Sequence, residues 1–226
     1  IQINLQQEKL VGVEALIRWK KEDGSLVYPD NFISIAEKCG LIKSLTKWVI
    51  TEACKQLKLW KNTSLANIPI SVNISAIDIA DHRFVESTLS ILETYDTPGH
   101  LINLELTESV FFDDINTVNF KLEELHRNNI TISLDDFGTG YSSLSYIQEL
   151  QIDFSFIFGM SKNKKSLAIV KSIIDMGNNL GLTVIAEGVE TLEDKETLIK
   201  ANCHIAQGYL YSRPIEASKL EEFYRQ

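Results

Sequence analysis

The stretch that decides the fold lies at positions 130–138 and reads ITISLDDFG. A short, mostly apolar and β-branched run of this kind is typical of a buried parallel strand, and here it ends in two carboxylates, Asp135 and Asp136. Gly138 then permits a turn. The stretch therefore predicts a strand that delivers acidic side chains to one end of a sheet.

Similar runs recur along the chain and alternate with amphipathic stretches. The predicted strands cover residues 11–16, 70–74, 102–106, 130–134, 152–157, 183–186 and 203–210. The predicted helices cover residues 43–61, 84–95, 119–128, 167–180 and 193–201, with Gly181 at a helix end and Thr191 at a helix start. Repeated strand–helix alternation predicts a parallel sheet, either a closed barrel or a doubly wound open sheet.

The strand ends favour the barrel. An open sheet gathers its ligand at one switch point, whereas a barrel active site takes side chains from the carboxyl ends of several strands. Polar residues lie at or near the ends of most predicted strands: Glu14, Asn73, Glu105, Asp135, Asp136, Glu187 and Gln207. We therefore predict a single α/β barrel domain over residues 1–226.

The composition argues against several classes of protein. A net charge of −9 disfavours a nucleic-acid-binding surface, which needs lysine and arginine to neutralise phosphates. No apolar run reaches the ~18 residues that a membrane span requires, so we expect no membrane contact by this domain. The three scattered cysteines form no CxxC pair, which argues against a zinc site and a disulfide framework and fits a cytoplasmic location.

Several carboxylates at one barrel mouth would repel one another and raise their pKa values. A divalent cation removes that cost, and oxygen ligands favour Mg²⁺ or Mn²⁺ over zinc. The adjacent Asp135 and Asp136 could serve two cations, an arrangement that supports displacement at a phosphorus atom. The sequence thus predicts an acidic metal site for a phosphate-containing ligand.

Six motifs follow one another in a specific order. They are EALIRW at 14–19, VNIS at 72–75, ELTES at 105–109, DDFGTGYSSL at 135–144, AEGVET at 186–191 and QGYL at 207–210. Together they resemble the EAL domain family over essentially the whole chain. The resemblance implies a modified TIM barrel that hydrolyses cyclic di-GMP to linear pGpG with Mg²⁺ or Mn²⁺, and in which bound Ca²⁺ would be inhibitory.

The resemblance also implies roles for individual residues. The implied metal ligands are Glu14, Asn73, Glu105, Asp135 and Asp136. The implied contacts to the dinucleotide are Leu16, Arg18, Asp136 and Gln207. Glu108 would anchor the loop that begins with the DDFGTG motif, called loop 6. Catalysis would depend on Glu14, Asp135 and Glu187.

The chain departs from the family pattern after loop 6. Complete members carry two tandem L-x-I-D elements, and the second has a catalytic lysine at x. Here one copy remains, at 150–153, and its x residue is Gln151; a reading without a gap puts Phe156 at the lysine position instead. Neither side chain takes up a proton, and loss of a positioned acid–base group typically costs ~10²–10⁴ in rate. The lysines of the polar loop 161–166 are interpreted as solvated charges.

The start of the chain differs as well. The family has a strand with Gln-Pro before the EAL motif, and that glutamine contacts the nucleotide, whereas this sequence opens at Ile1-Gln2-Ile3. We therefore expect the first barrel strand to be missing from the chain. The chain would then be a fragment of a longer signalling protein with an attached sensor or GGDEF domain.

Three functions remain as hypotheses. The first is a cyclic di-GMP-binding EAL domain with weak or no hydrolysis, and the second is an active phosphodiesterase. The third is a protein-interaction module that binds no nucleotide. By family resemblance, loop 6 and its helix, residues 141–150, would form the surface of a homodimer.

Overall fold

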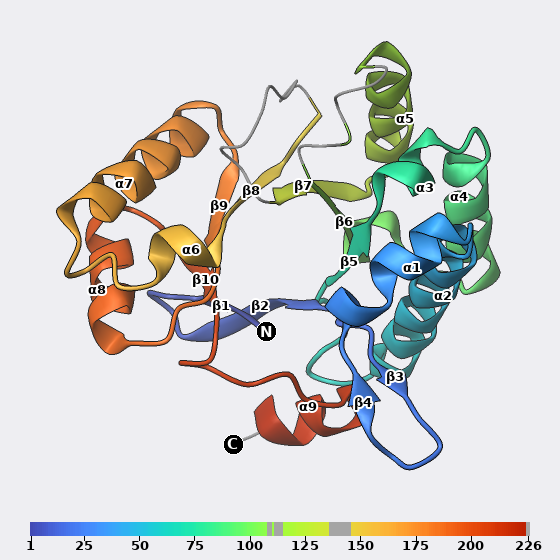
Figure 1. The fold of residues 1–226 in the computed structure, drawn as a ribbon, viewed down its shortest axis with the longest axis horizontal. Coiled ribbons are helices and arrows are strands. Elements are labelled where there is room, and N and C mark those ends of the chain that lie inside the picture. Colours follow the sequence, from blue (N-terminus) through green and yellow to red (C-terminus); the bar gives the residue numbers. More distant parts are fainter. Residues whose placement is uncertain (108–109, 111–114, 136–145, 225–226) are drawn as a thin grey trace.

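The computed structural model describes residues 1–107, 110, 115–135 and 146–224, and in this part of the chain eight strands close into a barrel (Figure 1). Around the barrel the strands follow the order β1-β10-β9-β8-β7-β6-β5-β2. Their bounds are β1 (Gln2–Asn4), β2 (Lys9–Glu14), β5 (Ile70–Ile74), β6 (Ile102–Thr107), β7 (Thr131–Asp135), β8 (Glu149–Ile152), β9 (Thr183–Ala186) and β10 (Ile205–Gln207). All neighbours pair in parallel except β1, which is antiparallel to both β10 and β2. The predicted α/β barrel is confirmed, and the open sheet is excluded.

Helices surround the barrel on its outside (Figure 1). The longer ones are α2 (Ile42–Trp60), α4 (Phe84–Thr94), α5 (Ile115–Arg127), α7 (Lys164–Asn179) and α8 (Leu192–Lys200), which confirms each predicted helix to within about one turn. The predicted boundary signals are confirmed too. Gly181 follows α7 with a φ of +73°, and the Thr191 side chain caps α8 by accepting a hydrogen bond from the backbone nitrogen of Asp194 at 3.1 Å.

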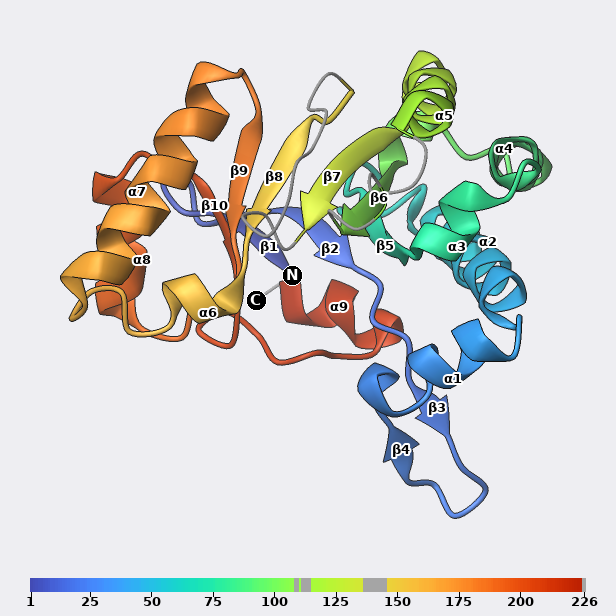
Figure 2. The same ribbon diagram turned by 45° about the horizontal axis from the view of Figure 1, so that its top comes forward.

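Several short elements were not predicted. They are the hairpin strands β3 (Trp19–Lys20) and β4 (Leu26–Val27), the 3₁₀ turns η1 (Pro29–Asn31) and η2 (Gly99–Leu101), and the helices α1 (Ile33–Lys38), α3 (Ala76–Ala80), α6 (Phe154–Ile157) and α9 (Ala217–Tyr224). Figure 2 shows the hairpin projecting away from the barrel. Elements of this length are too short to display a helical or strand period, so local contacts such as caps decide them. In α3, for example, Ser75 and Asp78 form a reciprocal capping box.

The barrel strands separate two environments. Side chains that point outward toward the helices are apolar and fully buried, such as Leu134, Leu150 and Ile152. Side chains that point inward are largely polar: the Asn103 amide on β6 donates to the Glu149 carboxylate on β8 at 2.8 Å, although β7 lies between these strands. Such a contact can only cross the barrel interior. The inside of the barrel is therefore a polar core, beneath the strand ends.

The expectation that the first barrel strand is missing is wrong. Residues Gln2–Asn4 form β1, which pairs with β10 on one side and β2 on the other and closes the barrel. Neither neighbour is left with an open edge. This three-residue strand was missed because only one of its residues, Ile3, is apolar, and a period cannot be recognised over so short a run.

The strand predicted at 152–157 is also displaced. The structure has β8 at Glu149–Ile152, and the chain then turns at Asp153, whose side chain caps α6 by accepting from the backbone nitrogen of Ser155 at 2.9 Å. The prediction failed because Glu149 and Gln151 point into the polar barrel interior. A strand with two polar inward-facing residues does not read as apolar on both faces.

Gly208, directly after β10, sits where no side chain fits. A Cβ there would lie 2.2 Å from the backbone oxygen and 2.3 Å from the backbone nitrogen of Val189. These atoms cannot move aside, because the Val189 nitrogen donates to the Gln207 carbonyl and its oxygen accepts from the Leu210 nitrogen, both at 3.0 Å. Gly208→Ala is therefore expected to lower the free energy of unfolding by about 3–5 kcal/mol, measured by urea denaturation, because the backbone around Val189 must shift to admit the methyl group.

The matched control for Gly208→Ala is Gly24→Ala in the β3–β4 hairpin. Gly24 has a φ of +83°, but nothing lies within 4 Å of its Cβ position. Alanine there carries only the backbone cost, about 1–2 kcal/mol. Equal losses in the two variants would contradict the steric explanation.

Candidate functional site

The predicted site residues come together at the carboxyl end of the barrel. Glu14 ends β2, Asn73 lies on β5 directly opposite Glu105 of β6, and Asp135 ends β7. The Asn73 amide donates to the Glu14 carboxylate at 2.8 Å. Because parallel strands end at the same mouth, the barrel itself brings these distant sequence positions into one cluster.

Gln207 connects two of the carboxylates. It is the last residue of β10, and its amide nitrogen lies 3.2 Å from Glu14 Oε2 and 2.7 Å from Glu187 Oε1. Glu187 follows directly after β9. The amide thus connects Glu14 of β2 with Glu187, which follows β9, although β1 and β10 lie between these two strands. Such a contact is expected for an inward-facing residue at the strand ends.

Gln151 faces the same cluster from β8. Its side chain is 1% exposed, and its amide nitrogen donates to Glu105 Oε1 at 2.5 Å. Phe156, the other candidate for the lysine position, lies in α6 and not on a barrel strand. The residue that meets Glu105 inside the barrel is therefore a neutral amide, which neither donates nor accepts a proton in acid–base chemistry.

The cluster is electrostatically strained in the absence of a cation. Burial, followed by the nearby charges of Asp135 and Glu14, raises the pKa of Glu187 to about 10. Burial and the charge of Glu14 likewise raise the pKa of Glu105 well above its ordinary range, although hydrogen bonds to its side chain act in the opposite direction. Both shifts mean that the folded protein disfavours the charged carboxylates.

These residues fit an oxygen-preferring cation in their chemistry. The cluster has an excess of acidic side chains, and the amide oxygens Oε1 of Gln151 and of Gln207 are buried without a hydrogen-bond partner among the described residues. No three Asp, Glu, His or Cys side chains in the described part of the chain have the spacing of a metal site. The ligand set that the resemblance implies also includes the amide of Asn73, which is not an acidic side chain, and the carboxylate of Asp136, which lies outside the described residues. The described carboxylates are therefore only part of that set.

The remaining predicted residues have different outcomes. Arg18 lies between β2 and β3, where one guanidinium nitrogen donates to the Ile17 carbonyl at 2.8 Å and the group stacks 4.9 Å from the centre of the Tyr28 ring. Leu16 is 41% exposed next to it. Asp136 and Glu108 lie outside the described residues. Their roles, and those of the other site residues, stay predictions.

One residue of the mouth was missed. Gln2 on β1 pairs in register with Gln207, is 5% exposed, and has a buried amide nitrogen without a partner in the described structure. Gln2 was not predicted as a site residue, because we expected the chain to begin after the Gln-Pro strand. The signal that could have found it is the glutamine itself, which stands one residue from the chain start in a strand-compatible segment.

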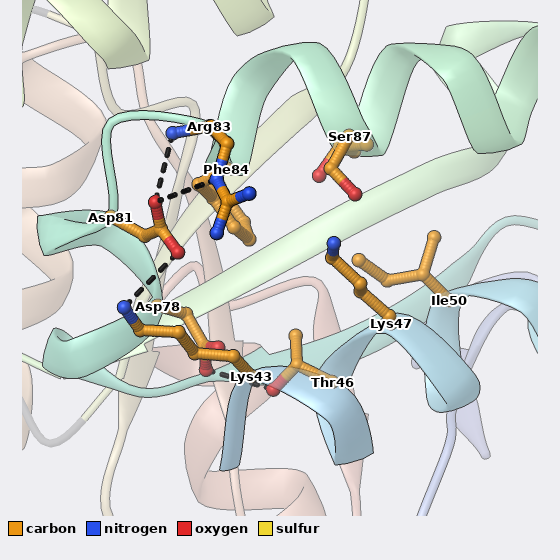
Figure 3. Close-up of a pocket in the computed structure, with 10 residues that line it drawn as sticks. Lys43, Thr46, Lys47, Ile50, Asp78, Asp81, Arg83, Phe84 and Ser87 are labelled. Atoms are coloured by element: carbon orange, nitrogen blue, oxygen red, sulfur yellow. Dashed lines mark hydrogen bonds and ion pairs between the residues drawn. The ribbon is translucent and has the colours of Figure 1, made fainter. Parts of the chain in front are cut away.

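A separate pocket is lined by residues of α2, of α3 and of the start of α4 (Figure 3). Its polar groups largely satisfy one another. Thr46 donates to Asp78 at 2.8 Å, Lys43 pairs with Asp81 at 3.0 Å, and the backbone nitrogen of Arg83 donates to Asp81 at 2.9 Å. These contacts hold helices α2, α3 and α4 together, so we place the functional site at the barrel mouth and not here.

The family model described as EAL domain matches residues 2–214 of the chain. The chain belongs to the EAL domain family. This EAL domain is 40% identical over 227 aligned positions to the signaling protein YkoW of Bacillus subtilis, covering 98% of this chain and 28% of that protein. It is 41% identical over 217 positions to the bifunctional diguanylate cyclase/cyclic di-GMP phosphodiesterase MucR of Pseudomonas aeruginosa, covering 93% of this chain and 32% of that protein.

A solved structure agrees with this assignment. The EAL domain superposes on the MucR phosphodiesterase in its cyclic di-GMP complex with a TM-score of 0.91 and 38% identity, over 97% of this chain and 91% of that one. The chain spans about a third of the length of the curated relatives above. In the described part of the EAL domain, no helix combines the length and the apolarity needed to cross a membrane.

Proposed function

We propose that the chain is a cyclic di-GMP-binding EAL domain in which hydrolysis to pGpG is weak or absent. One observation carries the proposal: the β8 side chain that contacts Glu105 is the amide of Gln151, at 2.5 Å. The resemblance implies a catalytic lysine at this position, and loss of a positioned acid–base group typically costs ~10²–10⁴ in rate. Binding needs no such proton transfer, so binding and cutting are separable.

Nucleotide binding is supported by the rest of the mouth. The Arg18 guanidinium uses one nitrogen for the Ile17 carbonyl and has further donors for a phosphate. Gln207 presents an amide at the mouth, between Glu14 and Glu187. The MucR structure, 38% identical over nearly the whole chain, is a complex with cyclic di-GMP.

We propose Mg²⁺ or Mn²⁺ as the cation, held by oxygen atoms of Glu14, Asn73, Glu105, Asp135 and Asp136. Bound there, a divalent cation would supply the positive charge that offsets both the clustered carboxylates and the ligand phosphates. Ca²⁺ also prefers oxygen ligands, and we expect it to support binding and to inhibit hydrolysis.

Calorimetric titration with cyclic di-GMP tests the proposal. Heat of binding is expected at micromolar protein and ligand when Mg²⁺, Mn²⁺ or Ca²⁺ is present, because cations relieve repulsion between the carboxylates and the phosphates. The matched control is Glu14→Gln, which removes one implied ligand charge with little change in shape and should bind more weakly. No heat with any of the three cations would contradict nucleotide binding and favour a protein-interaction module.

A second candidate function is an active phosphodiesterase. The observation that favours it is the closeness of the residues implied in catalysis, since Asp135 and Glu14 both raise the pKa of Glu187. Incubation with Mn²⁺ and chromatography for pGpG separates the two functions. Turnover well above that of the Glu14→Gln variant would favour the active enzyme over the proposal.

The assembly around this domain is also a proposal. The relatives are much longer than the chain, and one is named a bifunctional diguanylate cyclase/phosphodiesterase, which supports an attached GGDEF or sensor domain. Homodimerisation through residues 141–150 remains a prediction, because most of that segment lies outside the described residues. Light scattering at increasing protein concentration would test it.

A further inference from the structure

Gln151 uses only one end of its side-chain amide. The side chain is 1% exposed, and its nitrogen donates to Glu105 Oε1 at 2.5 Å. The amide oxygen, Gln151 Oε1, is also buried and has no hydrogen-bond partner among the described residues. A polar atom that is shielded from water normally meets a partner, which for an oxygen is a hydrogen-bond donor or a cation. Gln151 Oε1 is therefore a candidate ligand atom.

Asn73 on β5 shows the same arrangement. It lies directly opposite Glu105, and its amide nitrogen donates to Glu14 Oε1 at 2.8 Å. An amide binds a hard cation through its oxygen, and the family resemblance implies this role for Asn73. In both residues the nitrogen contacts a carboxylate of the implied ligand set, and the oxygen takes no part in that contact. The amide of Gln151 thus repeats the arrangement of an implied cation ligand.

The contact between Gln151 and Glu105 brings two oxygen ligands together. The oxygen and the nitrogen of the amide are bonded to the same carbon, so the oxygen lies within one amide width of the carboxylate that the nitrogen contacts. Oxygen ligands of one Mg²⁺ ion are about 3–4 Å apart, because each lies about 2.1 Å from the ion in octahedral geometry. A contact of 2.5 Å between the amide nitrogen and the carboxylate is compatible with this spacing.

Glutamine and lysine differ in what they contribute beside the carboxylates. An ammonium group at this position would offset the charge of Glu105 and would repel a bound cation. The amide of Gln151 is neutral and leaves the carboxylate charge in place. It also adds an oxygen, the ligand atom that suits Mg²⁺ and Mn²⁺. Glutamine at this position therefore favours cation binding, although it supplies no acid–base group.

We propose that Gln151 Oε1 is a direct ligand of the divalent cation at the barrel mouth. The inference rests on the proposed function, because it adds one residue to the cation site proposed there. Groups that only orient a metal ligand already contribute about 10- to 100-fold in metal affinity. Loss of the Gln151 oxygen is therefore expected to weaken cation binding by at least about 10-fold.

The first test is Mn²⁺ binding to the full chain without nucleotide, followed by the electron paramagnetic resonance signal of free Mn²⁺. Gln151→Leu removes the oxygen and is expected to bind Mn²⁺ at least about 10-fold more weakly than the unaltered chain. Gln151→Glu keeps an oxygen but loses the N–H donor to Glu105, and is expected to bind at least as tightly as the unaltered chain. Equal affinity of the leucine variant and the unaltered chain would overturn the inference, and so would a glutamate variant as weak as the leucine variant.

Gln151→Met distinguishes a direct ligand from a residue that only positions Glu105. Methionine is as long as glutamine and places a thioether sulfur, a softer ligand atom, near the position of the amide oxygen. The measured quantity is the ratio of Cd²⁺ affinity to Mn²⁺ affinity, with Cd²⁺ followed by its displacement of bound Mn²⁺. A direct ligand predicts a higher ratio in the methionine variant than in the leucine variant, because Cd²⁺ is the softer cation. The same ratio in both variants would mean that Gln151 only positions Glu105.

Leu150→Met is the matched control. It introduces a methionine on the opposite face of β8, where the fully buried Leu150 points toward the helices. If it weakens Mn²⁺ binding as much as Gln151→Leu does, the cause is disturbance of the strand and the inference is wrong. If the leucine variant does not fold, the Mn²⁺ affinities of the glutamate and methionine variants decide instead, and equal values count against the inference. Absence of Mn²⁺ binding by the unaltered chain is a different result and would overturn the proposed function itself.

Discussion

Replacing Gln151 by lysine is expected to raise the rate of pGpG formation by about 10²–10⁴-fold, the usual contribution of a positioned acid–base group. The replaced side chain already lies on β8 and contacts Glu105 at 2.5 Å, so a lysine amine would lie within reach of this carboxylate. The surrounding carboxylates, among them Glu14 and Glu187, would offset the cost of burying the ammonium group. The measurement is chromatography of pGpG in Mn²⁺ over time.

Gln151→Met is the matched control for Gln151→Lys. Methionine is as long as glutamine and carries no charge, so it should lose the contact to Glu105 without gaining turnover. An inactive lysine variant that still binds cyclic di-GMP would contradict the prediction. It would mean that the loss of one L-x-I-D element, and not the missing amine, limits hydrolysis.

The second large effect is on stability against pH in the absence of cations. The pKa of Glu187 rises from its ordinary value near 4.5 to about 10 in the folded protein, mainly through burial and then through the charge of Asp135. A raised carboxyl pKa means that the folded state binds more protons than the unfolded state over this window. The stability contributed by the protonated group is therefore fully present below about pH 4.5 and is lost as the pH rises toward 10.

Urea denaturation in EDTA at pH 6, 7.5 and 9 measures this loss. Glu187→Gln is expected to flatten the pH dependence, since an amide stays neutral throughout. The matched control is Glu190→Gln, which removes the same charge from an exposed position in the same segment and should leave the dependence unchanged. Added Mn²⁺ should restore stability most at pH 9, because it offsets the ionised carboxylates. A dependence that Glu187→Gln leaves intact would contradict the assignment to this residue.

Much of this fold could be predicted because each long element has its own period and its own boundary residues. The strand Thr131–Asp135 and the helix Ile42–Trp60 are of this kind, and both were recognised from the pattern alone. The displaced β8 and the missed β1 share one physical cause, in addition to the short length of β1. In β8 and β1, polar residues face the interior of a closed barrel. Prediction from a hydrophobic pattern assumes instead that polar residues face water.

The candidate site could also be predicted in part. The acidic residues at strand ends, such as Glu14, Glu105 and Glu187, could be grouped because parallel strands end at one mouth. The hydrogen bonds inside the barrel, such as that from Asn103 to Ser71, could not be predicted, because these side chains are inward-facing only once the barrel closes. No local property of the chain says that the amide of Gln207 spans from β10 to Glu14, or that Gln2 lies beside it.

The antiparallel β1 strand has a consequence for how the molecule folds. It joins Gln2 to Gln207, almost the full length of the chain apart, and so makes the pairing with the greatest loop-closure entropy. The other strands can pair in chain order, each with its predecessor. The barrel then closes where β1 pairs with both β10 and β2, and this place is called the seam. The bridge from Gln207 to Glu14 crosses that seam. The ligand site is therefore complete only when β1 pairs with β10. A ligand that binds there also stabilises the closed barrel, because it binds only this state.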